Sequence, residues 1–553
     1  MDIKEKLKIA VVVACEKAMT EGGLPRGELP EVHFEVPPQK TFGDFATNFA
    51  MQAAKGLRFN PRALAQAIER NIESPYLEKV EIAGPGFLNF FLKKDWLYEL
   101  LAEINKKGEN YGNLTKQEGM NIQIEYVSAN PTGPLHVGHG RGAAVGSTLV
   151  NVMRAAGYDV KAEYYINDAG NQINNLAASV NARYLQLLET PCDFPEDGYH
   201  GADIIETAKR IINTDGDKYL QLPTKERLAI FRELALQEKI ILLKEDLEKF
   251  NVTFDSWFSE QTLHNKSEIE NCCQELTQRG YMYEKDGAQW LKSTVFGDDK
   301  DRVVIRENGV PTYLAADIAY HKDKFSRGFK HLINIWGADH HGYINRMKAA
   351  CEALGYKSEQ LEVLILQMVS LYRDGELVKM SKRTGQSVTL NELIDEVGTD
   401  AARYFFIMRS IDSQLDFDLT LAADQTKKNP VYYIQYAHAR ICTLFKNVKE
   451  AGIDLKISSV DLSVLCEVSE LDLIKKLGEY EEEIACAAKE RAPHRIANFS
   501  YELARMFHYF YDQCRVLGID SDVQQSRLVL VKNVQNCLKH SLAVMGISAP
   551  EQM

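Results

Sequence analysis

Two histidines three positions apart carry the most informative chemistry in the sequence. His136 and His139 lie within the run Asn130–Gly140, which reads NPTGPLHVGHG. At this spacing both imidazoles lie on one side of the first turn of a helix, where free backbone N–H groups and the positive end of the dipole favour phosphate. Gly138 lets a phosphate or a flat group approach the backbone. The pattern predicts a nucleotide site whose imidazoles donate to oxygens that gain charge during the reaction.

A cluster of cations follows in residues 372–385. The cluster is Lys379-Met380-Ser381-Lys382-Arg383, with Gly375 and Gly385 on either side. Three cations within five residues, flanked by glycines, predict a loop that closes over a triphosphate and stabilises departing pyrophosphate. A charge cluster alone is usually a solvated surface turn, but its position downstream of the histidine motif favours the phosphate role.

The elements around the histidine motif predict a parallel sheet. Residues 121–127 form a predicted strand, a helix begins near Gly138, and residues 161–166 form a second strand. This β-α-β order requires parallel strands, and the same pattern resumes at 332–336 and 363–366. The predicted fold class is therefore α/β, with a Rossmann-like doubly wound sheet that binds ligands at the carboxyl ends of its strands.

We expect three domains in the 553 residues. Residues 1–110 predict a small α/β unit, with helices over 3–20, 43–56 and 61–73, strands at 80–82 and 87–91, and a Gly84-Pro85-Gly86 turn. Residues 111–425 predict the catalytic domain, with a mostly helical insertion at about 170–290. Residues 426–553 predict an all-helical domain, with helices over 430–450, 470–490, 493–516 and 523–545.

Composition limits the classes of partner. The 65 basic and 78 acidic residues give a net charge of -13, so nucleic acid must be bound through local patches rather than bulk charge. No apolar run is long enough to span a membrane. The ten cysteines are scattered without a C-x-x-C pair, so we expect neither a disulfide framework nor a structural zinc site. We expect a cytoplasmic monomer with no DNA or membrane partner.

Both signatures resemble those of the class I aminoacyl-tRNA synthetases, which are written HIGH and KMSKS. This chain has HVGH and KMSKR, and departs from the second signature only in its last residue. Within that class the sequence is most similar to the arginyl-tRNA synthetase family, and the similarity covers essentially the whole chain. Four longer runs carry it, namely residues 125–139, 311–320, 336–342 and 433–440.

The resemblance implies a two-step reaction. L-arginine would be activated by ATP with Mg²⁺ to give arginyl-adenylate and pyrophosphate, and the arginyl group would pass to the 3′-terminal adenosine of the tRNA. It also implies that the N-terminal domain contacts the tRNA, that the helical domain binds the anticodon, and that activation requires bound tRNA. No covalent enzyme intermediate is needed, so catalysis would depend on positioning and charge stabilisation.

The resemblance also implies residue roles. The arginine site would contain Glu125, Ser128, Asn130, His139, Tyr313, Asp317 and Asp339. The ATP site would contain His136, His139, Gly337, Asp339, His340, Met380, Ser381 and Lys382. Catalysis would depend on His136, Gly138, His139, Lys379 and Lys382, with no metal ligand. Tyr433, Tyr436, Arg440 and Arg505 would contact tRNA. A carboxylate beside an aromatic ring suits a planar guanidinium with five donors, which supports the pairing of Asp317 with Tyr313.

Several alternatives stay open from the residues alone. A class I synthetase for another amino acid would share both signatures, although cysteine specificity is disfavoured without a visible zinc cluster. A free-standing nucleotidyltransferase would leave the helical domain and the Tyr313–Asp317 element unexplained. A non-catalytic RNA-binding paralogue should have lost His136, His139 or Lys382, which are all present. The aromatic residues of the helical domain fit a helix core as well as an RNA surface.

Overall fold

The computed structural model describes residues 3–378, 387–456 and 460–553, and the chain divides into two compact units. Unit 1 comprises Met1–Gly108, Leu455–Gly478 and Arg515–Leu530, and unit 2 comprises Glu109–Asp454, Glu479–Cys514 and Val531–Met553. Across the described ranges, no helix combines the length and the apolar character that a membrane crossing requires.

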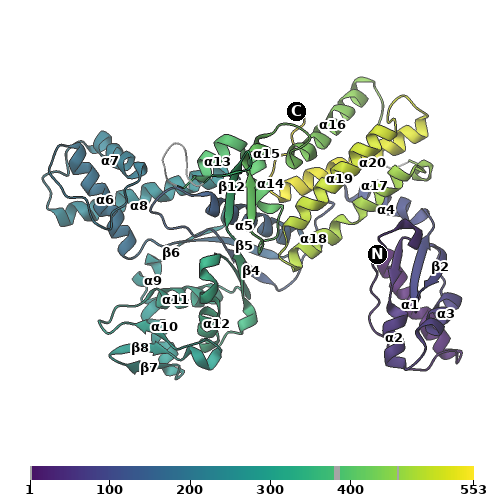
Figure 1. Ribbon diagram of the computed structural model, residues 1–553, viewed down its shortest axis with the longest axis horizontal. Helices are drawn as coiled ribbons and strands as arrows, with labels where there is room; N and C mark the ends of the chain where they lie inside the picture. The colour runs from purple at the N-terminus through teal and green to yellow at the C-terminus, as the bar shows by residue number, and fades with distance from the viewer. Residues whose placement is uncertain (1–2, 379–386, 457–459) are drawn as a thin grey trace. The chain divides into compact units, whose positions relative to one another are not determined.

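Unit 1 contains a three-stranded antiparallel sheet in the order β1-β3-β2 (Figure 1). Its strands are β1 (Phe45–Thr47), β2 (Leu77–Ala83) and β3 (Phe87–Leu92). Its first helices are α1 (Ile3–Thr20), α2 (Phe49–Leu57), α3 (Pro61–Asn71) and α4 (Asp95–Lys107). The predicted turn is confirmed, because Gly84 and Gly86 have φ of 52° and 143°. The helix predicted from residue 43 begins only at Phe49, because residues 45–47 pair with β3.

The central sheet of unit 2 has five parallel strands in the order β11-β10-β4-β5-β6. They are β4 (Asn121–Glu125), β5 (Asp159–Ile166), β6 (Ser256–Ser259), β10 (His331–Gly337) and β11 (Leu361–Leu366). The chain builds outward from β4 to β6 on one side and then continues with β10 and β11 on the other. The strand order therefore reverses between β4 and β10, which is where ligands of doubly wound folds bind.

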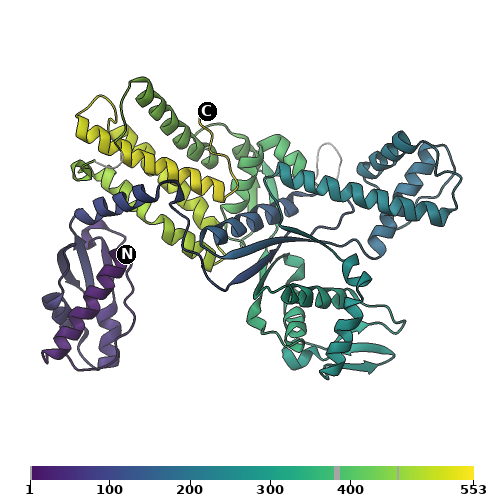
Figure 2. The ribbon, with the colours of Figure 1, turned by 180° about the vertical axis from the view of Figure 1, so that it is seen from behind.

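Helices cover both faces of this sheet. Helix α5 (Val137–Ala155) packs against β4, β5 and β10 and lies along the sheet in both views (Figures 1 and 2). On the other face, α11 (Tyr313–Ser326) and α12 (Ile344–Ala353) share an apolar core with β10 and β11 through Leu332 and Leu361. The predicted doubly wound α/β fold is confirmed.

The insertion predicted at about 170–290 is mostly helical, and it also contains short strands that the sequence did not predict. Its helices are α6 (Asn171–Leu187), α7 (Ala202–Asp215), α8 (Thr224–Lys249), α9 (Gln261–Asn265) and α10 (Glu268–Gln278). Strand β6 instead completes the central sheet, and β7 (Met282–Lys285), β8 (Ala288–Leu291) and β9 (Arg302–Ile305) form a separate antiparallel sheet. Short strands of this kind are easily missed, because four residues give too little periodicity to identify.

A further small sheet follows β11. It consists of β12 (Val369–Arg373), β13 (Glu376–Val378) and β14 (Leu415–Asp418), with helices α13 (Leu390–Val397), α14 (Thr399–Ile407) and α15 (Leu419–Ala423) alongside. The prediction that residues 372–385 form a loop is wrong for the first part of that range. There β12 and β13 make a hairpin whose turn, Asp374-Gly375, has φ of 52° and 84°.

The described part of residues 426–553 is helical and contains no strand, as predicted. Its helices are α16 (Pro430–Glu450), α17 (Val468–Gly478), α18 (Tyr480–Lys489), α19 (His494–Gln513) and α20 (Ser521–Val544). The single helix predicted over 470–490 is two helices, which separate at Gly478 and Glu479. Helix α17 and the start of α20 belong to unit 1, whereas α16, α18 and α19 belong to unit 2.

Candidate active site

The two histidines begin α5 directly after the loop that follows β4. His136 is the N-cap residue, and its Nδ1 accepts a hydrogen bond from the Gly138 N–H at 3.2 Å. The Nδ1 atom of His139 accepts from the His136 N–H at 3.3 Å. The two rings stack with their centroids 3.7 Å apart. Because the histidines cap the helix that follows a parallel strand, the sequence itself places them at the carboxyl edge of the sheet.

These hydrogen bonds fix which imidazole nitrogen can donate. Each Nδ1 accepts a backbone N–H, so the proton of each neutral ring is on Nε2. Burial lowers the pKa of His136, and burial together with the neighbouring ring lowers the pKa of His139 to about 4. Both rings are therefore neutral at pH 7 and present Nε2–H donors. Gly138 is exposed beside them, and a Cβ there would lie 3.1 Å from the His136 ring.

Strained backbone separates β4 from the histidines. Val127 and Ser128 have φ of 67° and 41°, which non-glycine residues rarely adopt and which is most costly for a β-branched side chain. Strain of this kind concentrates at binding sites. Here it turns the Ser128 hydroxyl back, so that it donates to Glu125 Oε1 at 3.0 Å and accepts the Tyr165 N–H at 3.1 Å. Glu125 is buried, whereas Asn130 is exposed.

A group of carboxylates comes from the end of β4, the residue after β6 and the start of α11, namely Glu125, Glu260 and Asp317. The Tyr343 hydroxyl donates to Asp317 Oδ2 at 2.6 Å, and the Tyr165 hydroxyl donates to Glu260 Oε2 at 2.8 Å. Burial, with help from Glu125 and Glu260, raises the pKa of Asp317 to about 7. The same three carboxylates, together with burial, raise the pKa of Tyr165 well above its usual value. An excess of negative charge in a buried place is suited to a cationic ligand.

Tyr313 and the residues after β10 complete the candidate site. Tyr313 is at the start of α11, one turn before Asp317 on the same helical face, and is 62% exposed. Gly337 ends β10, and Asp339 and His340 follow in the 3₁₀ helix η4 (Ala338–Tyr343). Both side chains are exposed, and His340 Nε2 lies 3.4 Å from Asp339 Oδ2. These exposed groups are free to meet a ligand at the carboxyl edge of the sheet.

The predicted lysine cluster is the second signature of the sequence. Lys379, Met380, Ser381, Lys382 and Arg383 lie outside the described residues. The residues that follow are described, and they meet the histidine motif. Thr389 forms a backbone bridge with His136, and the Val137 N–H donates to the Val388 carbonyl oxygen at 3.2 Å. The chain thus returns from the lysine cluster to the start of α5.

Comparison with known proteins decides the family. Residues 100–415 match the catalytic domain of class I (R) tRNA synthetases, residues 3–92 match the arginyl-tRNA synthetase N-terminal domain, and residues 434–553 match the DALR anticodon binding domain. This chain belongs to the arginyl-tRNA synthetase family. Membership excludes the alternative of a class I family for another amino acid.

Individual relatives of this family agree along the whole length. The arginine–tRNA ligase of Carboxydothermus hydrogenoformans is 53% identical over 527 residues, which are 95% of each chain. Arginine–tRNA ligase 1 of Halalkalibacterium halodurans is 51% identical over 555 residues, covering 100% of this chain and 99% of that one. The solved Thermus thermophilus arginyl-tRNA synthetase has the same fold, with a TM-score of 0.76 over both whole chains at 22% identity.

The aromatic residues predicted to contact tRNA cluster in the helical bundle of this synthetase. The Tyr436 ring stacks on His508 with centroids 5.6 Å apart, and the Tyr433 ring meets His508 at an angle of 47° with centroids 4.6 Å apart. The Arg440 guanidinium lies 4.1 Å from the centre of the Tyr511 ring. Arg505 pairs with Glu502 on the exposed side of α19. The rings of Tyr433, Tyr436 and Tyr511 are half-buried, whereas His508 is buried, so the tyrosines pack the bundle and remain partly exposed.

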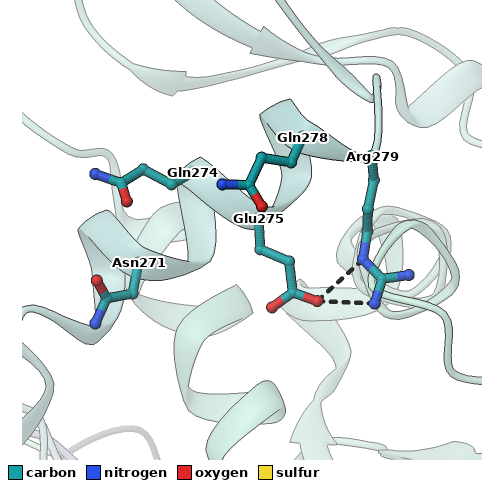
Figure 3. A pocket seen from close by; sticks show the side chains of 5 residues that line it. All are labelled: Asn271, Gln274, Glu275, Gln278 and Arg279. Carbon is teal, nitrogen blue, oxygen red and sulfur yellow. Dashed lines mark hydrogen bonds and ion pairs between the residues drawn. The ribbon is translucent and has the colours of Figure 1, made fainter.

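A hollow of about 550 Å³ on α10 is separate from the candidate active site. It is lined by Asn271, Gln274, Glu275, Gln278 and Arg279 (Figure 3). None of the predicted site residues lines it. Its walls come from one helix and the residue after it, and Glu275 pairs with Arg279 at 2.8 Å, so the hollow is an open surface depression.

The structure adds residues that sequence reasoning missed. They are Tyr165, Glu260, Lys324 and Tyr343, which contact or surround the predicted carboxylates. One signal could have drawn attention to Lys324. Strand β4 reads Asn-Ile-Gln-Ile-Glu, and polar residues at alternate positions of a central parallel strand require buried partners.

Proposed function

We propose that this synthetase activates L-arginine with ATP and transfers the arginyl group to the 3′-terminal adenosine of its tRNA. The observation that supports the proposal is that two chemically different groups of side chains follow the carboxyl end of β4 or lie near it. Neutral stacked imidazoles offer donors to phosphate oxygens, and a buried group of carboxylates offers acceptors to a cation. Few substrates other than a guanidino acid with a nucleotide satisfy both chemistries.

The ATP end of the site would be formed by the start of α5. The Nε2–H groups of His136 and His139 would donate to the α-phosphate as its charge grows, and Gly138 would allow close approach. Gly337, Asp339 and His340 would border the ribose, and Lys379, Met380, Ser381 and Lys382 would close on the β- and γ-phosphates. ATP would enter as its Mg²⁺ complex, so the metal is part of the substrate.

The arginine end would be formed by helix α11 and the segment after β4. The Asp317 carboxylate would bind the guanidinium beside the ring of Tyr313, with Glu260 adding negative charge. Glu125, Ser128 and Asn130 would meet the α-amino and carboxylate groups, and His139 and Asp339 would complete that end. Contact at both ends of the substrate would align its carboxylate with the α-phosphorus.

The chemistry then follows in two displacement steps. A carboxylate oxygen of arginine attacks the α-phosphorus, the bond to the β-phosphate breaks, and pyrophosphate leaves. The terminal 2′-hydroxyl of the tRNA, as in class I enzymes, next attacks the arginyl carbonyl carbon. That hydroxyl loses its proton, and AMP leaves. The enzyme's part is alignment and charge stabilisation, with no covalent intermediate.

We further propose the three-part organisation of 1–110, 111–425 and 426–553 for binding tRNA. Family matches at 3–92, 100–415 and 434–553 support it. The helical domain would bind the anticodon stem-loop through Tyr433, Tyr436, Arg440 and Arg505, because rings stack unpaired bases and cations meet phosphates. The N-terminal domain would contact another part of the tRNA, and the chain would act as a monomer in the cytoplasm.

One assay tests the central proposal. ATP–pyrophosphate exchange is measured with each of the standard amino acids, with and without tRNA for arginine. Of the standard amino acids, we expect only arginine to support exchange. We expect that exchange only when tRNA is present. Exchange that depends on another amino acid would contradict the assignment of the carboxylate pocket to a guanidinium.

A further inference from the structure

A row of polar side chains crosses three strands of the central sheet beneath α11. Asn334 on β10, Glu125 on β4 and Glu163 on β5 are register partners, so their side chains project from the same face. The interior of a parallel sheet is usually apolar, and buried polar groups there require partners. Glu163 is paired with Arg327 through two hydrogen bonds of 2.6 and 2.8 Å.

Glu125 is paired with a different cation, Lys324. The Lys324 side chain is fully buried, and its Nζ lies 2.6 Å from Glu125 Oε2 and 3.1 Å from Asn334 Oδ1. The same ammonium lies 4.3 Å from the centre of the Tyr320 ring. Because no part of Lys324 reaches the surface, it acts on a ligand only through its neighbours.

A chain of hydrogen bonds continues from Lys324 to Asp317. The Asn334 Nδ2 lies 2.8 Å from His321 Nε2, and His321 Nδ1 lies 2.7 Å from the Asp317 carbonyl oxygen. A carbonyl only accepts, so Nδ1 carries the proton and Nε2 accepts from Asn334. Burial lowers the pKa of His321 to about 3, which agrees with a neutral ring. Lys324 Nζ, Asn334 Nδ2 and His321 Nδ1 each donate to an acceptor in this chain.

Lys324 is also a cation that acts on Asp317. Charged and titratable groups face Asp317 from five elements or their ends, namely Glu125 on β4, Tyr165 on β5, Glu260 before α9, His321 and Lys324 on α11, and Tyr343 at the end of η4. Burial, Glu125 and Glu260 raise the pKa of Asp317, whereas Tyr343 and Lys324 lower it.

We propose that Lys324 is a positioning residue that offsets part of the negative charge of the arginine pocket, so that Asp317 meets the guanidinium as a carboxylate. A cation buried between α11 and the sheet does this without occupying the place of the substrate. This inference rests on the proposed function, because it assumes that the cationic ligand is arginine.

The test is the pH dependence of kcat/KM for arginine in tRNA charging, which reports groups of the free enzyme. It is measured from about pH 5.5 to 8.5 for the parent chain, Lys324→Met, Glu125→Gln and the double variant. Arginine binding requires ionised Asp317, so kcat/KM falls as the pH falls through the pKa of that carboxyl. The midpoint is informative even where a variant lowers activity at every pH.

The expected midpoints follow the charge of the pocket. Removal of the Lys324 cation raises the midpoint by about one pH unit, which lowers kcat/KM about tenfold on the acid side. Removal of the Glu125 charge lowers the midpoint. The double variant loses one charge of each sign, so its midpoint returns close to that of the parent. A role confined to folding would not produce this order.

Helix α11 also provides a control substitution. Lys322→Met removes a cation two residues away that pairs with Glu275 at 2.8 Å, and should leave the midpoint unchanged. If Lys324→Met does not fold, the double variant is compared with Glu125→Gln. The double variant should fold, because removing both partners of a buried pair is better tolerated than removing one. Its midpoint should be higher than that of Glu125→Gln, because it also lacks the Lys324 cation.

An unmoved midpoint in Lys324→Met, or equal midpoints in Glu125→Gln and the double variant, would overturn the role of Lys324. If the parent chain charges tRNA with arginine in that case, the proposed function stands. Failure of the parent to use arginine would instead overturn the proposed function, and with it this inference.

Discussion

Asp317 combines burial, neighbouring carboxylates and a tyrosine donor, and these determine how it can bind a cation. The Asp317→Asn substitution keeps the shape of the side chain and removes its charge. We expect kcat/KM for arginine to fall about 1,000-fold, because a site built for a guanidinium loses its acceptor. The KM for ATP should change little. Steady-state charging with each substrate varied would check this, and unchanged arginine kinetics would remove Asp317 from the site.

Tyr343 acts on the same carboxyl from η4. Its hydroxyl lowers the pKa of Asp317, so Tyr343→Phe should raise that pKa above about 7. Ionised Asp317 is then present only at higher pH, and arginine binding should weaken several-fold at pH 7 and recover by about pH 8.5. Arginine titrations by calorimetry at several pH values measure this shift. Weakening that is equal at every pH would indicate a role in packing only.

In the proposed phosphate site, His139 would act as a neutral hydrogen-bond donor rather than as a positive charge. We expect His139→Ala to slow adenylate formation about 100- to 1,000-fold, because a preorganised donor to the developing charge is lost. His139→Gln should retain more activity, since its amide can donate. With the pKa of the parent side chain at about 4, protonation of His139 should not limit the rate between pH 5.5 and 8. Rapid-quench measurement of adenylate formation would check both variants, and a near-normal rate in His139→Ala would contradict the role.

At the scale of elements, the position of α5 depends on a close approach to the end of β4. A Cβ at Gly146 would lie 2.3 Å from ring atoms of the fully buried Tyr126. Gly146→Ala should therefore destabilise the fold by about 1–3 kcal/mol and displace the helix that carries both histidines. The thermal unfolding temperature and the rate of tRNA charging should both decrease in this variant.

A second glycine on α5 provides the matched control. A Cβ at Gly142 would meet Leu366 at 3.7 Å, which is ordinary contact. Gly142→Ala should keep or slightly raise the stability, since alanine favours helix by about 1 kcal/mol over glycine. Equal losses in the two variants would show that α5 tolerates no added side chain, rather than that Tyr126 sets its position.

At the scale of the whole molecule, a chain with a net charge of -13 must bind tRNA through local cations and rings. Arg440 lies over Tyr511 in the helical bundle and is such a candidate. We expect Arg440→Ala to raise the KM for tRNA several-fold and to reduce its salt dependence, with the KM for arginine unchanged. Arg440→Lys should restore the salt dependence but only part of the affinity, because it lacks the planar stack. Equal tRNA kinetics in all three proteins would place the RNA elsewhere.

Much of the fold was predictable because its signals are local. The helix predicted from near Gly138 follows from apolar spacing, and the β-α-β order requires a parallel sheet. Both depend on neighbours within a few turns. By contrast, strand β6 is four residues long, and no local pattern shows that it joins the sheet. The hairpin of β12 and β13 was not predicted, because the lysine cluster and its flanking glycines led us to expect a loop there.

The sequence by itself determined the chemical groups of this synthetase: paired imidazoles at a helix start, a lysine cluster, and an Asp317 one turn after Tyr313. Only the tertiary structure decided their electrostatic setting. Lys324 meets Glu125 from 199 positions away, and Tyr343 meets Asp317 from 26 positions away. Such partners depend on strand order and register, and a pKa depends on the burial that these produce. The residue types in the sequence therefore indicate the reaction, whereas their packing in the tertiary structure determines their protonation states.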